Sequence, residues 1–311
     1  MAEIFDRPLR AAILAAADNT FVQRVVSRYG FSLGAKRFVA GETAGDFLAV
    51  AIALNGQGFA VACGILGEGV RSASEAGAAT DQYCALLDAF ADQGIDANVA
   101  FKITHVGLDI DPRLAFENAA RIAQAAERTG NTMRLDMEQS RYVDATLDVY
   151  SRLRGRYSCV GFVLQSYLFR SMDDLQRLIP LRPNVRIVKG AYLEPPSIAF
   201  ARKTDVDANY LRLVETSLEG EGYTAVATHD RRIVERVMHL AEQRAIPKRG
   251  RFEFQMLYGI STPFAHELVR AGYRVRLAVP FGNYWFPYLM RRLAERPANL
   301  AFFAKGALKR G

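Results

Sequence analysis

Eight short β-rich segments alternate with amphipathic stretches along this chain, and no other feature limits its fold as strongly. The β-rich segments are Phe59–Leu66, Val99–Thr104, Thr132–Met137, Tyr157–Gln165, Val185–Ala191, Thr224–Thr228, Phe252–Leu257 and Tyr273–Val279. Apolar residues recur at helical spacing in Arg113–Arg128, Tyr142–Leu153, Asp205–Leu218, Arg231–Arg244 and Pro263–Arg270. Strands that alternate with helices pair in parallel through right-handed crossovers. Eight such units predict an α/β fold, a distorted (β/α)8 barrel of the TIM type.

The domain organisation follows from where the alternation starts. No Pro/Gly/Ser-rich linker divides the chain, so we expect an N-terminal helical arm over residues 1–56 and a catalytic barrel over residues 57–311. An open doubly wound sheet would need a Gly-rich fingerprint after its first strand. Gly56-x-Gly58 precedes that strand, and Val61 stands where the third glycine should be. The pattern therefore favours a closed barrel.

The net charge of +7 is concentrated near the C-terminus, where six basic residues accompany Glu295 as the one acid of the last 26 residues. The basic residues are Arg291, Arg292, Arg296, Lys305, Lys309 and Arg310. Such an end fits peripheral attraction to anionic lipid or an acidic partner better than a nucleic-acid surface. It equally fits solvated charge at the end of a chain.

The cysteines and the N-terminal residues indicate the cellular compartment of the protein. Cys63, Cys84 and Cys159 form no metal spacing and no CxxC pair, which is typical of a reducing compartment. The histidines have no metal-binding spacing either, so we expect no metal site. Met1–Arg10 mixes acids and bases, unlike a signal peptide, and Asn55–Gly58 interrupts the longest charge-poor stretch. We expect a cytoplasmic protein, with peripheral contact at the inner face of the cell membrane.

Polar side chains gather where the predicted strands end. They are Glu68, Lys102, Asp136, Glu138, Gln165, Arg186, Lys189, Thr228, His229, Asp230 and Gln255. In a (β/α)8 barrel this carboxyl end carries the chemistry. A charge such as Arg186 inside a strand buried on both faces needs a partner or a ligand. Structural roles are open as well: a Lys102–Asp136 salt bridge in the barrel interior, a strand-end cap at residues 228–230, and a core amide at Gln165.

Two adjacent arginines, Arg291 and Arg292, lie on a helix-like segment over residues 287–297. The planar guanidinium fork donates parallel hydrogen bonds that suit a carboxylate or a phosphate. Alone, such a pair also fits a solvated helix face. Together with the polar strand ends, it points to binding of a small anion.

Taken together, these segments resemble the proline dehydrogenase family, in its short monofunctional bacterial form. The segments, in the order of the family, are Leu66-Gly67-Glu68, Phe101-Lys102-Ile103-Thr104, Arg134-Leu135-Asp136-Met137-Glu138, Gly161-Phe162-Val163-Leu164-Gln165-Ser166-Tyr167, Val185-Arg186-Ile187-Val188-Lys189-Gly190-Ala191-Tyr192, Ala227-Thr228-His229-Asp230, Phe252-Glu253-Phe254-Gln255-Met256-Leu257 and Arg291-Arg292-Leu293-Ala294-Glu295. The resemblance implies FAD-dependent oxidation of L-proline to Δ1-pyrroline-5-carboxylate, by hydride transfer from proline C5 to flavin N5.

The resemblance also implies roles for the substrate-side residues. The proline carboxylate would be bound by three cations, Arg291, Arg292 and Lys102. These cations can orient the substrate although its ring has few other groups for the protein to bind. Asp136 would hold Lys102 or lie near the substrate amine. The catalytic and ring-packing residues implied are Asp136, Arg186, Tyr192 and Leu257, of which the last two form an apolar wall. A Glu68–Arg291 ion pair would latch the last helix over the substrate as a gate.

On the cofactor side, the resemblance places Arg186 near flavin N5, where its charge favours the reduced ring. The residues that match the FAD-contacting segments of the family are Met137, Gln165, Lys189, Gly190, Ala191, Thr228 and His229. Gly190 lies where main chain would approach a phosphate closely. Electrons would pass on to a quinone.

The sequence departs from the family at Ala278, where many members have a tyrosine that lines the substrate pocket. Either Tyr284 or Trp285 fills the gap, or the pocket is roomier, which leaves the substrate range open. Three alternative functions compete with proline oxidation. They are an FAD-binding methylenetetrahydrofolate reductase, a Schiff-base aldolase using Lys102 or Lys189, and a non-catalytic basic binding protein.

Overall fold

Eight parallel strands form the centre of the protein in a computed structural model that describes residues 37–67, 70–286 and 288–290. The strands are β1 (Ala60–Ile65), β2 (Ala97–Lys102), β3 (Met133–Asp136), β4 (Val160–Gln165), β5 (Asn184–Val188), β6 (Tyr223–Ala227), β7 (Phe252–Leu257) and β8 (Val275–Phe281). They are hydrogen-bonded in chain order and close into a barrel. The predicted (β/α)8 fold is confirmed, and each predicted β segment overlaps one strand.

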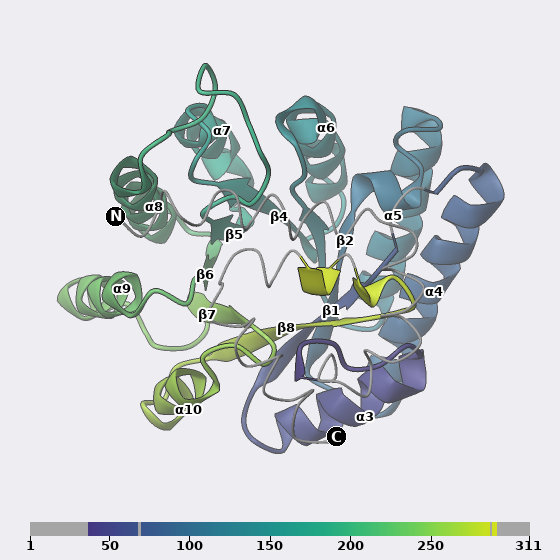
Figure 1. Ribbon diagram of the computed structural model, residues 1–311, viewed down its shortest axis with the longest axis horizontal. Helices are drawn as coiled ribbons and strands as arrows, with labels where there is room; N and C mark the ends of the chain where they lie inside the picture. Colours follow the sequence, from purple (N-terminus) through teal and green to yellow (C-terminus); the bar gives the residue numbers. More distant parts are fainter. Residues whose placement is uncertain (1–36, 68–69, 287, 291–311) are drawn as a thin grey trace, which may run out of the picture. The chain divides into compact units, whose positions relative to one another are not determined.

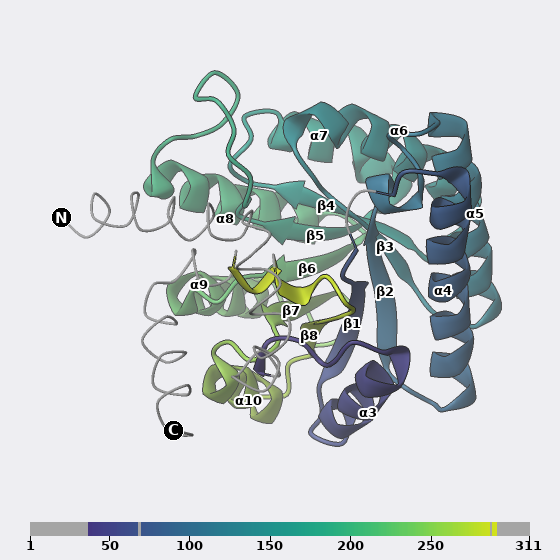
Figure 2. The ribbon, with the colours of Figure 1, turned by 45° about the vertical axis from the view of Figure 1, so that its right-hand side comes forward.

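Helices α4 to α10 surround the strands (Figure 1), and α4 and α5 lie side by side (Figures 1 and 2). The helices are α3 (Ala44–Asn55), α4 (Ala73–Asp92), α5 (Pro112–Arg128), α6 (Val143–Arg154), α7 (Ser171–Leu178), α8 (Lys203–Glu219), α9 (Arg231–Gln243) and α10 (Thr262–Arg270). Short 3-10 helices are η2 (Ile103–Val106), η3 (Ser140–Tyr142) and η4 (Ile179–Leu181). Side-chain caps start four of these helices: Thr43 at α3, Ser72 at α4, Asp111 at α5 and Asp230 at α9.

The chain divides into two compact units. The larger comprises residues 51–64 and 69–278 and contains α4 to α10. The smaller comprises residues 1–50, 65–68 and 279–311; within it, the Ala40 amide donates to the Pro280 carbonyl at 2.9 Å and the Gly282 amide to the Gly41 carbonyl at 3.0 Å. Of the predicted arm over residues 1–56, the structure describes only residues 37–56, which include α3. The boundary at residue 56 stays a prediction.

The fold differs from the sequence prediction at the end of the fifth strand. β5 ends at Val188, three residues before the predicted end at Ala191. Gly190 adopts φ +112°, a left-handed conformation that glycine reaches without strain and that turns the chain out of the sheet. Lys189, Gly190 and Ala191 therefore belong to the β5–α8 loop and not to a strand.

Buried charges fill the barrel interior below the strand ends. Glu253 on β7 accepts from Arg276 Nε at 2.8 Å and from Gln255 Nε2 at 2.6 Å, and Arg276 Nη1 donates to the Val61 carbonyl at 2.8 Å. Burial alone would raise the pKa of Glu253, but the Arg276 guanidinium and these hydrogen bonds outweigh it and lower the pKa to about 2. The hydrogen bonds of this ion pair go to protein atoms. We therefore expect the functional site at the carboxyl ends of the strands.

The depressed pKa of Glu253 predicts acid sensitivity with a defined sign. Between pH 4.5 and about 2 the unfolded chain binds a proton at Glu253 that the folded chain does not bind, so the free energy of unfolding should fall as pH is lowered through this window. The loss is on the order of 3 kcal/mol, at ~1.4 kcal/mol per pKa unit. Urea unfolding at several pH values should show this slope, and Glu253→Gln should reduce it. An unchanged slope in Glu253→Gln would contradict the assignment. Glu117→Gln, at an exposed carboxylate, is the control.

Candidate functional site

An ion pair across the barrel interior lies at the centre of the candidate site. Arg186 on β5 donates through Nη2 to Asp136 Oδ1 on β3, and its Nη1 lies 3.5 Å from Gln255 Oε1 on β7. The three side chains come from alternate strands, as the interior layers of such barrels do. The Arg186 side chain is only 12% exposed, and its Nε is buried with no hydrogen-bond partner among the described residues. The layer thus presents a fixed cation with one donor left for a ligand.

The orientation of Gln255 follows from its two neighbours. Glu253 is ionised and can only accept hydrogen bonds, so Gln255 must turn its Nε2 toward it. The Oε1 atom of the same amide then faces the Arg186 guanidinium. Sequence analysis placed Gln255 at a strand end without a role, because its link to Arg186 depends on which side chains point into the closed barrel.

Main-chain tethers join neighbouring strand ends. Gln165 Nε2 on β4 donates to the Glu138 carbonyl at 2.8 Å, and the Leu257 amide donates to His229 Nε2 at 3.1 Å. An amide can only donate, so Nε2 carries no hydrogen and a neutral imidazole has its proton on Nδ1. Both bonds use predicted cofactor-binding residues to hold the rim of the barrel in place.

Glu138, which follows β3, is buried and accepts from Thr104 through the Thr104 amide at 3.3 Å and through its hydroxyl at 2.8 and 2.9 Å. Burial raises the pKa of Glu138, and the Thr104 hydrogen bonds and the charge of Lys102 oppose that rise. Lys102 and Asp136 are register partners on the adjacent strands β2 and β3. The ion pair found for Asp136, however, is with Arg186, which sequence analysis did not predict.

A second charge cluster lies beside the ends of β5 and β6. Lys189 Nζ lies 2.6 Å from Asp207 Oδ1 and 3.2 Å from Asp230 Oδ2, and Lys203 pairs with the same two acids. Burial would raise the pKa of Asp230, but the hydrogen bond from Lys189 and the two lysine charges lower it. Asp230 Oδ1 also caps α9 by accepting from the Arg232 amide, so this residue serves the helix that follows β6.

Of the remaining predicted residues, Met137 and Thr228 are buried directly after β3 and β6, Tyr192 is half-buried in the β5–α8 loop and Leu257 ends β7. Ala278 is half-buried on β8. Trp285 is buried and donates through Nε1 to Glu42 at 3.1 Å, whereas Tyr284 is 61% exposed. Glu68, Arg291 and Arg292 lie outside the described residues, so carboxylate binding by the two arginines and the gate stay predictions.

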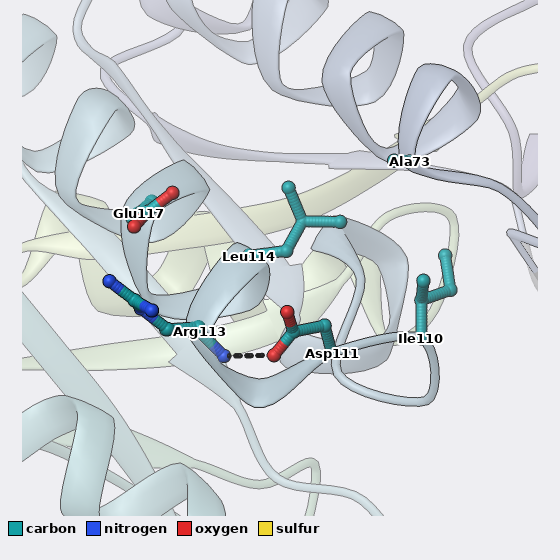
Figure 3. A pocket seen from close by; sticks show the side chains of 6 residues that line it. All are labelled: Ala73, Ile110, Asp111, Arg113, Leu114 and Glu117. Atoms are coloured by element: carbon teal, nitrogen blue, oxygen red, sulfur yellow. Dashed lines mark hydrogen bonds between the residues drawn. The ribbon is translucent and has the colours of Figure 1, made fainter.

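Figure 3 shows a surface pocket away from these side chains. Its lining comes from the starts of α4 and α5 and the loop before α5: Ala73, Ile110, Asp111, Arg113, Leu114 and Glu117. Asp111 Oδ1 is already used there as the cap that accepts from the Arg113 amide at 2.8 Å. The lining holds none of the predicted site residues, so the strand ends remain the candidate site. In the described part of the chain, no group of three or more His, Cys, Asp or Glu side chains could hold a metal ion.

Comparison with known proteins identifies the family of this chain. The proline dehydrogenase family model matches residues 47–305. Proline dehydrogenase 1 of Bacillus subtilis (strain 168) is 37% identical over 302 residues, covering 97% of this chain and 100% of the relative. Proline dehydrogenase of Deinococcus radiodurans is 41% identical over 311 residues, covering 98% of this chain and 100% of the relative.

A solved structure shows the same fold. The crystal structure of proline utilization A from Bdellovibrio bacteriovorus, inactivated by N-propargylglycine, matches with a TM-score of 0.80 and 27% identity. The match covers 86% of this chain and 33% of that chain, so this chain spans about a third of that longer protein.

The Arg186–Asp136 pair predicts coupled effects on stability. Asp136→Ala should lower the free energy of unfolding by about 1–3 kcal/mol, because it leaves a nearly buried guanidinium without its counter-charge. Arg186→Met alone removes the cation, and the double variant should recover part of the loss. Urea unfolding of all four proteins without ligand measures the coupling. Strictly additive effects of the two substitutions would contradict the pair.

Proposed function

This chain belongs to the proline dehydrogenase family and oxidises proline, and we propose that it does so with FAD at the carboxyl ends of its barrel strands. The family match over residues 47–305 carries the assignment. The proposed product is Δ1-pyrroline-5-carboxylate. Family membership also removes the reductase, the aldolase and the non-catalytic binding protein as alternatives.

The residues at the strand ends fit a flavin. Arg186 has a buried Nε without a hydrogen-bond partner among the described residues, a donor that a ring nitrogen or oxygen would satisfy. Buried polar groups at Gln165 and Thr228 lie at the ends of the two strands that flank β5. Bound FAD supplies the two-electron acceptor for the hydride that leaves proline C5. Arg186 would hold positive charge beside flavin N5, and Asp136 would fix its orientation.

The remaining cofactor contacts are proposed around the β5–α8 loop and the β6 end. Lys189, Gly190 and Ala191 would contact FAD through the loop, with Met137, Thr228 and His229 at neighbouring strand ends. Asp207 and Asp230 fix the position of the Lys189 side chain, because a carboxylate oxygen of each lies within 3.2 Å of Lys189 Nζ. Ion pairs of this kind restrict a long side chain to one position before a ligand arrives.

Substrate binding would rest on charge at one end of proline and apolar contact around the ring. Lys102, at the end of β2, would bind the carboxylate together with Arg291 and Arg292. Tyr192 and Leu257 would pack against the ring and exclude water from the hydride path. We also propose the Glu68–Arg291 pair as a gate. Ala278, in place of a tyrosine, is the position at which the substrate range of this chain would differ from that of other members.

We further propose that the electrons pass to a quinone, with the basic residues near the C-terminus contacting anionic lipid at the cytoplasmic face of the membrane. Among the described residues, no helix is long and apolar enough to cross a bilayer. Peripheral contact of this kind would bring a barrel to its lipid-borne acceptor by electrostatic attraction.

Anaerobic titration with L-proline tests the proposed chemistry. The purified protein should be yellow, and L-proline should bleach its visible flavin absorbance, whereas NADH should leave the absorbance unchanged. A yellow protein that responds to NADH and not to proline would contradict the proposed reaction. A colourless protein that FAD cannot reconstitute would contradict the proposed cofactor.

A further inference from the structure

The β5–α8 loop, residues 189–202, connects the end of β5 to α8 and carries Tyr192. Its C-terminal half is fastened to the segment that follows β4. Leu168 and Ala199 form an antiparallel bridge, the Phe169 amide donates to the Ile198 carbonyl at 3.0 Å, and the Phe200 amide donates to the Tyr167 carbonyl at 2.8 Å. These contacts fix where the loop rejoins the barrel wall.

The start of the loop lies on the ring of Tyr167. A Cβ atom at Gly190 would clash with Tyr167 Cδ1, so the main chain here lies against the tyrosine ring and leaves no room for a side chain. The Tyr167 amide donates to the Lys189 carbonyl at 2.9 Å. Burial and the Glu194 carboxylate raise the pKa of Tyr167, and interaction with the Tyr192 main chain opposes the rise. Tyr167 thus supports the start of the loop at Lys189 and Gly190.

Glu194 fastens the tip of the loop to the neighbouring β3–α6 connection. Its Oε1 accepts from the Ser140 amide at 2.6 Å, and its Oε2 accepts from the Ser140 hydroxyl at 2.8 Å. Ser140 begins η3, which leads directly into α6. The carboxylate therefore accepts hydrogen bonds at a helix start, where main-chain N–H groups have no partner within the helix. Two charge-assisted bonds in one contact fix both position and orientation. We call this contact the Glu194–Ser140 clasp.

We propose that Glu194 is a positioning residue for proline binding: through the clasp it holds residues 190–194, and with them Tyr192, at the strand ends. This inference rests on the proposed function, in which Tyr192 packs against the proline ring. Tyr192 lies two residues before Glu194 and two after Gly190, between the clasp and the Tyr167 support. Without the clasp, the loop keeps its attachment at residues 198–200 but loses the contact that Glu194 makes with Ser140.

The functional consequence is specific to substrate binding. A loosened Tyr192 must be ordered again each time proline binds, and that conformational cost weakens binding. The Arg186–Asp136–Gln255 layer does not touch the clasp residues in any described contact, and Lys189 and Gly190 keep their contacts with Tyr167. The flavin should therefore stay bound. The Michaelis constant for proline should therefore rise while kcat and FAD content stay near those of the parent.

Hydrogen–deuterium exchange tests the structural half of the inference on the FAD-loaded protein without proline. Glu194→Gln and Ser140→Ala should each speed exchange of the amides in residues 190–197, by about tenfold if each change removes one charge-assisted bond. Two matched controls change side chains away from the clasp. Glu215→Gln removes an α8 carboxylate that bonds Arg244, and Ser151→Ala removes a hydroxyl on α6. Unchanged exchange in both clasp variants would overturn the clasp.

Steady-state kinetics test the functional half. Both clasp variants should raise the KM for L-proline by about five- to twentyfold with kcat within about twofold. The double variant should raise KM by less than the product of the two single effects, because both substitutions weaken the same contact. Equal losses in kcat and FAD content would overturn the positioning role and indicate general destabilisation. If the parent protein fails to oxidise proline, the proposed function fails, while the exchange measurement still decides whether the clasp holds the loop.

Discussion

A charged side chain on a strand buried on both faces needs a counter-charge, and in this barrel that need is met in the interior by the Arg186–Asp136 pair. Three strands contribute to the layer, since Gln255 on β7 faces the same guanidinium. The cation can exist there because one carboxylate neutralises it. The proposed flavin chemistry depends on the same arrangement.

The interior is divided into two polar layers with different properties. The Glu253–Arg276 pair is closed: both side chains are buried and their hydrogen bonds go to protein atoms. The Arg186 layer is incomplete, with one buried donor that no described residue satisfies. Gln255 joins the two, because Glu253 fixes which end of its amide faces Arg186. A stable lower layer thus orients an upper layer that is left ready for a ligand.

The spacing of apolar residues was enough to predict the barrel. This spacing differs between strands and helices, and eight strand–helix repeats are compatible with few sheet topologies. It was not enough at Val185–Ala191, where a single left-handed glycine ends the strand earlier than its apolar run suggests.

Helices α4 and α7 were absent from the predicted helical stretches. α4 is rich in alanine on all sides, and α7 has only eight residues, so neither shows a strong apolar stripe. The ion partner of Asp136 was beyond prediction, since β3 and β5 meet only across the closed interior. The roles implied for Glu68, Arg291 and Arg292 remain predictions outside the described residues.

Arg186 would hold a fixed positive charge beside the proposed flavin, and the midpoint potential of the bound flavin reports on that charge. Arg186→Met should bind FAD and shift the potential to more negative values, because the negatively charged reduced ring loses a stabilising cation. A shift of about 30 mV corresponds to ~1.4 kcal/mol for a two-electron couple, and we expect at least this much. Arg212→Met, at a distant arginine on α8 that bonds Asn209, should leave the potential unchanged. An unchanged potential in Arg186→Met, with FAD bound, would contradict the placement of the flavin at this cation.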